Sequence, residues 1–211
     1  QLQPPVPKIY KAKGVVNYTQ SSMSVQNAKL SLLGGEARLD GGLRFADGAP
    51  EAQTRLVLQG SVSADAIKQA PELVSMSGVW AKLKGSTSYI ATMGLSQGVP
   101  ELTILSNLQG MAIDLPEPLD KRASALLPMR YETTVLGSSA GRSHPSLEQM
   151  RFTLGQLLSL NYVRDISGAV PTVLRGNLQL GNLPAPKEAS DQSVVLQIKQ
   201  PYLNMDEWNP F

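Results

Sequence analysis

The side chains that could carry out catalysis are few in this sequence. Its one histidine, His144, lies in a stretch of glycines and serines before Pro145, and the sequence contains no cysteine. A histidine acting as a general base needs a nucleophile or a carboxylate within hydrogen-bond reach, and the sequence alone cannot place such a partner. We therefore interpret His144 as an exposed loop residue and predict that the chain is not an enzyme. The least favoured alternative is a hydrolase built on His144.

Metal and phosphate sites are equally poorly supported. Zinc prefers His and Cys ligands, and a calcium loop needs a tight run of carboxylates. The closest acidic pair, Asp206 and Glu207, is interpreted as a solvated turn near the end of the chain. The double glycine at Gly34 and Gly35 lacks the lysine spacing of a phosphate-binding loop. We predict no metal and no cofactor.

Composition narrows the class of protein further. The 211 residues are 42% hydrophobic and 17% charged, which indicates a folded chain long enough for one large β domain or two small ones. The formal net charge is +2 and no basic stripe is present, so we predict no nucleic-acid binding. No run approaches the roughly 18 to 20 apolar residues of a membrane-spanning helix. Because the chain starts at Gln1, we expect a processed protein or a fragment, with any anchoring segment outside it.

The elements that would have to position any site are mainly strands. In the stretch 101–121, Leu102, Ile104 and Leu108 alternate with polar residues up to Gly110, which is the pattern of a strand with one wet face. Prolines at 116 and 118 then end the strand. Similar runs predict strands over 8–19, 23–26, 28–33, 36–45, 53–62, 78–83, 87–95, 102–113, 129–136, 150–154, 157–164, 170–180 and 194–199, and a helix over 63–70. Leucines in 147–160 partly fit helical spacing, but Phe152, Thr153 and Gly155 favour strands there.

A Leu-x-Gly unit recurs in or at the end of these runs. It begins at residues 39, 58, 83, 108 and 174. Because glycine inside a strand often marks a bulge or bend, the repetition predicts long antiparallel strands curled into a β-taco-like groove, with one or two short helices. Chance matches between two common residues are the alternative. The alternating aliphatic residues would either fill an ordinary sandwich core, which the pattern alone favours, or line a groove for an apolar ligand.

Residues 106–121 carry a family resemblance. Their sequence, Ser-Asn-Leu-Gln-Gly-Met-Ala-Ile-Asp-Leu-Pro-Glu-Pro-Leu-Asp-Lys, resembles the S-x-L-x-G-x-x-x-x-L-P-x-P-x-x-K signature of the YhdP group within the AsmA-like proteins of Gram-negative bacteria. Passages 37–45 through 60–64, 173–181 and 203–208 are also similar to that group. The signature and structural positions are Gly110, Leu115, Pro116, Pro118, Lys121, Gly176, Asp206 and Trp208.

This resemblance implies a fold, a location and a function. The chain would be one β-rich fragment, residues 1–211, of a longer protein, with sub-repeats 8–115 and 121–208 joined at the proline segment Leu115 to Lys121. It would lie in the periplasm, with an inner-membrane anchor outside this fragment. Its apolar groove would carry phospholipid acyl chains between the inner and outer membranes and so support the outer-membrane barrier. Other parts of the protein would contact the two membranes.

Strand parity selects residues for that groove. The lipid-groove candidates are Leu102, Ile104, Leu108, Leu154, Leu158, Leu160, Leu178 and Val194. We expect Asp114, Glu117 and Lys121 to fix the bend by local pairing rather than to form an active site. The alternative function is a non-catalytic structural or protein-interaction β module of the cell envelope. A fragment of a longer sheet would also expose edge strands, which predicts edge-strand self-association.

Overall fold

The computed structural model describes residues 8–44, 53–70, 77–96, 98–137, 146–168, 171–183, 193–202 and 204–208. His144 therefore lies outside the described residues. The strands are β1 (Ile9–Tyr18), β2 (Ser22–Leu32), β3 (Gly35–Arg44), β4 (Gln53–Ser63), β5 (Leu83–Ser96), β6 (Val99–Ser106), β7 (Met111–Ile113), β8 (Met129–Gly137), β9 (Leu147–Leu154), β10 (Leu158–Asp165), β11 (Thr172–Leu180) and β12 (Val194–Ile198). The helices are α1 (Ala64–Gln69), α2 (Ser77–Trp80) and α3 (Met205–Trp208), and none of these described helices is long and apolar enough to cross a membrane.

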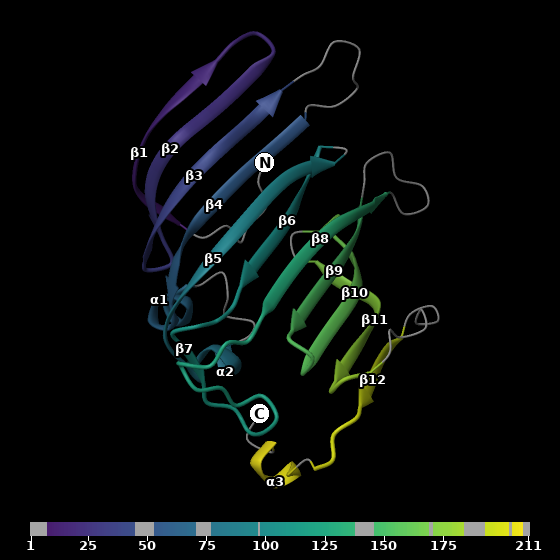
Figure 1. Ribbon diagram of the computed structural model, residues 1–211. Helices are drawn as coiled ribbons and strands as arrows, with labels where there is room; N and C mark the ends of the chain where they lie inside the picture. The colour runs from purple at the N-terminus through teal and green to yellow at the C-terminus, as the bar shows by residue number, and fades with distance from the viewer. Residues whose placement is uncertain are drawn as a thin grey trace.

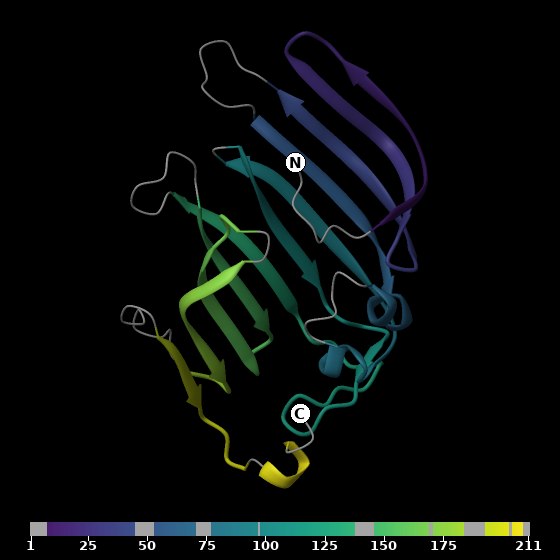
Figure 2. The ribbon, with the colours of Figure 1, turned by 180° about the vertical axis from the view of Figure 1, so that it is seen from behind.

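One sheet contains all of these strands. Its order follows the chain from β1 to β6 and from β8 to β12, and β7 pairs with β5 off this path (Figure 1). Neighbours are antiparallel except β11 and β12, which are parallel. The same succession is visible from behind (Figure 2). The predicted mostly β class with long antiparallel strands is confirmed.

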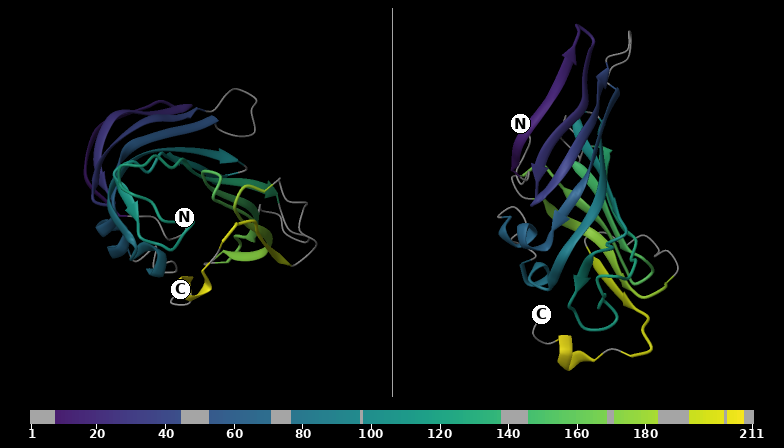
Figure 3. Two further views of the ribbon diagram at one scale, coloured as in Figure 1. Left: turned by 60° about the horizontal axis from the view of Figure 1, so that its bottom comes forward. Right: turned by 60° about the vertical axis from the view of Figure 1, so that its left-hand side comes forward.

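The predicted curl is stronger than the one observed. The sheet is neither closed nor strongly curled. Among the described strands, β1 and β12 form its two edges (Figure 3). In the Leu-x-Gly units, Gly41, Gly85 and Gly110 have positive φ, whereas Gly60 and Gly176 do not and stay paired within their ladders. The glycines therefore do not impose the same bend on every strand.

The stretch 102–113 is not one strand, as predicted, but two. Ser106 accepts a hydrogen bond at Oγ from the Leu108 amide, 3.0 Å, and Leu108 has φ +52°, so the chain turns away where β6 ends. It returns as β7, which pairs with the start of β5. Gly110 has φ +91°, and a Cβ there would lie 2.4 Å from the Ser86 carbonyl oxygen. Only glycine fits this crossing without displacing the backbone.

Two other predicted boundaries also shift. The predicted strand 78–83 is wrong for most of its length, because helix α2 occupies Ser77–Trp80 and β5 begins at Leu83. The separate strands predicted over 23–26 and 28–33 form one strand, β2, with a register shift between Val25 and Ala28. Strands rather than a helix are confirmed in 147–160, where β9 and β10 pair.

Apolar side chains gather at one end of the sheet, and we call this group the end cluster. Its buried members are Ala64, Leu83, Leu108, Met111, Ile113, Leu119, Leu154 and Leu180. Side chains from α1, α2 and α3 pack against it, including Ile67, Trp80 and Trp208. Figure 1 shows α1, α2, β7 and α3 together at the lower end of the sheet. The hydrophobic core of the described chain is thus concentrated at this end.

Candidate binding face

Strand pairing defines two faces of the sheet, because residues directly opposite each other on neighbouring strands point to the same side. One unbroken line of directly paired residues crosses ten strands, and every member is apolar or aromatic. This line, which we call the apolar ladder, consists of Ala28, Leu39, Leu58, Ala91, Ile104, Tyr131, Phe152, Leu160, Leu178 and Leu196. All ten side chains are partly exposed.

Further apolar rows flank the ladder on the same side, which we call the apolar face. Between β2 and β6, one row joins Val25, Gly41, Leu56, Met93 and Leu102. Toward the end cluster, a row joins Met129, Leu154, Leu158, Leu180 and Ile198. The end cluster packs on this same face, since it includes Leu154 and Leu180.

The opposite face is polar and carries surface ion pairs. Arg38 Nε lies 2.6 Å from Asp40 Oδ2, and Arg130 Nε lies 3.0 Å from Glu132 Oε2. The backbone amide of Asn27 and then the Arg38 guanidinium hold the pKa of Asp40 below its ordinary value. The hydrogen bond from Arg130 likewise lowers the pKa of Glu132. The sheet is therefore amphipathic across its whole width.

Seven of the eight lipid-groove candidates lie on the apolar face. Ile104, Leu160 and Leu178 belong to the ladder, and Leu102, Leu154 and Leu158 belong to the two rows beside it. Val194 lies on the same face, opposite Gly176. Leu108 lies elsewhere, with 8% exposure inside the end cluster, because the chain has left β6 before it. These seven residues thus share one face of the sheet, and their contact with lipid stays a prediction.

The signature residues 110–121 build the turn beside the end cluster. Lys121 is 6% exposed. Its ammonium donates hydrogen bonds to the carbonyl oxygens of Leu108 and Met111, both at 2.7 Å, and of Arg122, at 3.0 Å. The expected pairing with Asp114 and Glu117 is not found: Asp114 pairs with Lys84 at 3.1 Å. Burial lowers the pKa of Lys121.

The other signature residues have different surroundings. Leu115 packs on the end cluster, and the bond between Glu117 and Pro118 is cis. The Trp208 indole donates to the Glu117 carbonyl oxygen at 3.2 Å, which ties α3 to the proline segment. Pro116 accepts at its carbonyl from the Leu119 amide, and Asp206 is exposed. A Cβ at Gly176 would lie 2.2 Å from the Tyr162 ring, so that the aromatic side chain and the glycine form one packed pair across β10 and β11.

One ion pair interrupts the apolar face. Glu148 and Arg164 are directly paired on β9 and β10, and Arg164 Nε donates to Glu148 Oε2 at 3.1 Å, with a second, shorter bond from its terminal nitrogen to the same oxygen. Burial alone would lower the pKa of Arg164, but the hydrogen bond to Glu148 and the neighbouring charge raise it. The Tyr131 hydroxyl lies near Arg164, and burial raises the pKa of Tyr131.

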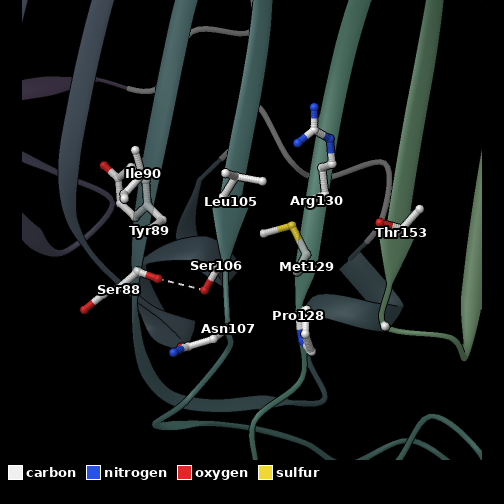
Figure 4. A pocket seen from close by; sticks show the side chains of 11 residues that line it. Ser88, Tyr89, Ile90, Leu105, Ser106, Asn107, Pro128, Met129, Arg130 and Thr153 are labelled. Atoms are coloured by element: carbon white, nitrogen blue, oxygen red, sulfur yellow. Dashed lines mark hydrogen bonds between the residues drawn. The ribbon is translucent and has the colours of Figure 1, made fainter.

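A hollow of about 450 Å³ lies on the polar side of the sheet, where β5, β6, β8 and β9 approach the excursion to β7. Across its mouth run Ile90, Leu105, Arg130 and Thr153, which are directly paired in that order (Figure 4). None of the eight lipid-groove candidates lines it. The one guanidinium group in its lining, that of Arg130, is paired with Glu132.

The comparison with family models decides the family. The model described as YhdP protein matches residues 1–211, the whole chain. The chain belongs to the YhdP family. This is a family of cell-envelope proteins and is generally non-catalytic. Comparison with the curated proteins and with the solved structures gave no match.

Several residues on the apolar face of this YhdP family chain are not among the candidates predicted from sequence. The N-terminal ladder members Leu39 and Leu58 lie in Leu-x-Gly units and could have been predicted from that repeat. Tyr131 and Phe152 were not recoverable, because their place in the ladder depends on the pairing of β6 with β8 across the 107–128 excursion. The described residues contain no group of three or more His, Cys, Asp or Glu side chains that could hold a metal ion.

Proposed function

We propose that this chain is a periplasmic segment of an AsmA-like envelope protein whose apolar face carries phospholipid acyl chains between the inner and outer membranes, supporting the outer-membrane barrier. An inner-membrane anchor would belong to parts of the protein outside this chain, as would the contacts with both membranes. The function requires no chemical step, in keeping with a generally non-catalytic family.

The apolar ladder is the observation that supports this proposal. It crosses ten strands without a polar residue other than the Tyr131 hydroxyl. With strands about 4.8 Å apart, nine spacings give a path of about 43 Å along the sheet. A line of partly exposed aliphatic side chains of this length is unusual for a surface that contacts only water.

The energetics suit a sliding chain. Each methylene removed from water contributes about 0.8 kcal/mol, so an acyl chain gains from every rung that it covers. Because successive rungs are chemically alike, a shift by one strand exchanges one aliphatic contact for another. Binding should therefore depend little on position along the ladder, and the polar head can stay in water.

Photocrosslinking with a phospholipid that bears a photoactivatable acyl chain tests the proposal. Ile104→Asp places a charge on the ladder and should abolish labelling. Leu105→Asp is the matched control, because Leu105 is the next residue of β6 and faces the polar side, where it is 41% exposed. It should leave labelling unchanged.

The two variants also separate the faces. Labelling that survives Ile104→Asp would rule out the apolar face as the acyl-chain path. Labelling lost only in Leu105→Asp would instead assign the chain to the hollow on the polar side. Circular dichroism of both variants checks that the sheet has kept its secondary structure.

The second candidate function is a structural or interaction module of the envelope, favoured by the free edges of the sheet. Among the described strands, β1 and β12 each have a neighbour on one side only, and large apolar residues on both are exposed, among them Val15 and Leu196. Such edges offer unpaired backbone groups to another strand. A protein that labels with no lipid and pairs through these edges would fit this function.

A further inference from the structure

The charges on the apolar face are confined to one place. Among the residues that strand pairing puts on this face in β2 to β6 and β8 to β12, only Glu148 and Arg164 are charged. Their side chains are 10% and 19% exposed. Two charges removed from water on an otherwise uncharged face need a reason.

Stability is a weak reason for this pair. The desolvation of two charges offsets most of their attraction, and well-packed apolar residues of similar size serve as well or better. The neighbours in the same row are Val135 on one side and Val173 on the other, so an apolar pair would continue the row. The row is aliphatic on both sides, yet these two positions hold a guanidinium and a carboxylate.

The location relative to the ladder is informative. Glu148 lies four residues along β9 from Phe152, and Arg164 lies four residues along β10 from Leu160. At about 3.3 Å per residue, the pair is about 13 Å from the ladder on the side away from the end cluster. An amphiphile with its head at Arg164 would lay its acyl chain across Tyr162 and Met150 onto the ladder.

Resting on the function proposed above, we propose that Arg164 binds the phosphate of a phospholipid whose acyl chain lies on the apolar ladder, and that Glu148 competes with that phosphate for the same guanidinium. Arginine matches a phosphate with paired N–H donors, and the Glu148 carboxylate presents the same acceptor geometry. Tyr131, a member of the ladder, lies near Arg164. The pair is then the resting state of a head-group site.

Two probes that differ only in the phosphate test this inference on the whole chain. Phosphatidic acid and diacylglycerol, each with the same photoactivatable acyl chain, are presented at equal mole fraction in nonionic micelles. Glu148→Gln frees the guanidinium and should raise labelling by phosphatidic acid about fivefold, which corresponds to about 1 kcal/mol. Labelling by diacylglycerol should not change.

The double variant Glu148→Gln, Arg164→Gln should reduce labelling by phosphatidic acid to the level of diacylglycerol. It leaves no buried charge unpaired, so loss of the fold does not explain the result. Arg151→Gln is the matched control, because Arg151 lies on β9 with its side chain exposed on the polar face. Both probes should label this control as they label the unmodified chain.

The outcomes separate the two proposals. If Glu148→Gln leaves phosphatidic acid labelling unchanged or lowers it while diacylglycerol still labels the chain, the head-group site is overturned and the acyl-chain path stands. If neither probe labels the unmodified chain, the acyl-chain path fails and the head-group site fails with it.

Discussion

Lys121 is the residue whose burial the sequence pattern explains least. A lysine next to acidic residues in a proline-rich turn is expected to form a surface ion pair. The Lys121 ammonium instead donates hydrogen bonds to three backbone carbonyls at 2.7 to 3.0 Å. Those carbonyls belong to the turn that leads from β6 to β7 and to Arg122. The Leu108 carbonyl also accepts from the Met111 amide within the turn, and Lys121 adds further hydrogen bonds to the Leu108, Met111 and Arg122 carbonyls.

Lys121→Ala should lower the free energy of unfolding by about 2 to 4 kcal/mol, since it removes three hydrogen bonds to backbone carbonyls. Urea denaturation measures the loss. Lys84→Ala is the control, because Lys84 and Asp114 form an exposed pair, and its loss should stay below about 1 kcal/mol. A Lys121→Ala chain that melts normally but no longer labels with phospholipid would contradict this structural role.

Glu132 provides a pH-dependent prediction on the polar face. Its pKa is lowered from 4.5 chiefly by the hydrogen bond from Arg130. The stability contributed by this pair is fully present above pH 4.5 and is lost as the pH falls through the lowered folded-state pKa.

Arg130→Gln should therefore raise the pKa of the Glu132 carboxyl toward 4.5, as followed by NMR titration of that carboxyl carbon. Arg151→Gln, whose charge acts on Glu132 only through space, should raise it less. Because the pair is partly exposed, the associated change in stability should be below about 1 kcal/mol. An unchanged titration in Arg130→Gln would show that the pair is not formed in solution.

At the scale of elements, alternation of apolar and polar residues predicted most strands but not their breaks. Strand alternation continues in sequence through Leu108, yet the backbone turns there, because Ser106 caps the end of β6 and β7 joins β5 instead. Helix α2 was missed because Gly78 and Val79 carry little helical preference, and its position depends on packing of Trp80 in the end cluster. Local pattern sets element type, whereas tertiary contacts set these boundaries.

Gly110→Ala tests the crossing between β5 and β7. The alanine would meet both a left-handed backbone and a carbonyl oxygen 2.4 Å from its Cβ, so we expect a loss of about 2 kcal/mol or more in thermal unfolding. Gly98→Ala is a matched control, because Gly98 also has positive φ, +76°, but its Cβ would meet nothing within 4 Å. Its loss should be about 1 kcal/mol. Equal losses would show that steric contact at the crossing contributes nothing.

At the scale of the whole molecule, the sequence predicted part of the candidate binding face. The period-2 spacing selected seven candidate residues from β6, β9, β10, β11 and β12 that share one face of the sheet. The pattern could not say that the ladder is continuous, because continuity depends on register between strands far apart in the chain, such as β6 and β8. Nor could it pair Glu148 with Arg164, which requires the register of β9 with β10.

The two free edges lead to a prediction about association. We expect the isolated chain to self-associate through β1 and β12, with a mass that rises with concentration in sedimentation equilibrium. Val15→Lys and Val195→Lys place charges on these edges and should suppress association. Leu126→Lys, at a residue that is 63% exposed but away from any strand, should not. Suppression by Leu126→Lys alone would assign association to general surface hydrophobicity instead.

The single-layer sheet also determines how the chain should unfold. Most described strands contact only the strands on either side, and the end cluster is the one large group of buried side chains among the described residues. Such an array behaves like a row of coupled units rather than an all-or-none globule. Amide hydrogens in β5, β8 and β9, near the cluster, should exchange slowest, and protection should decline strand by strand toward β1 and β12, so that the edges open while the centre stays folded.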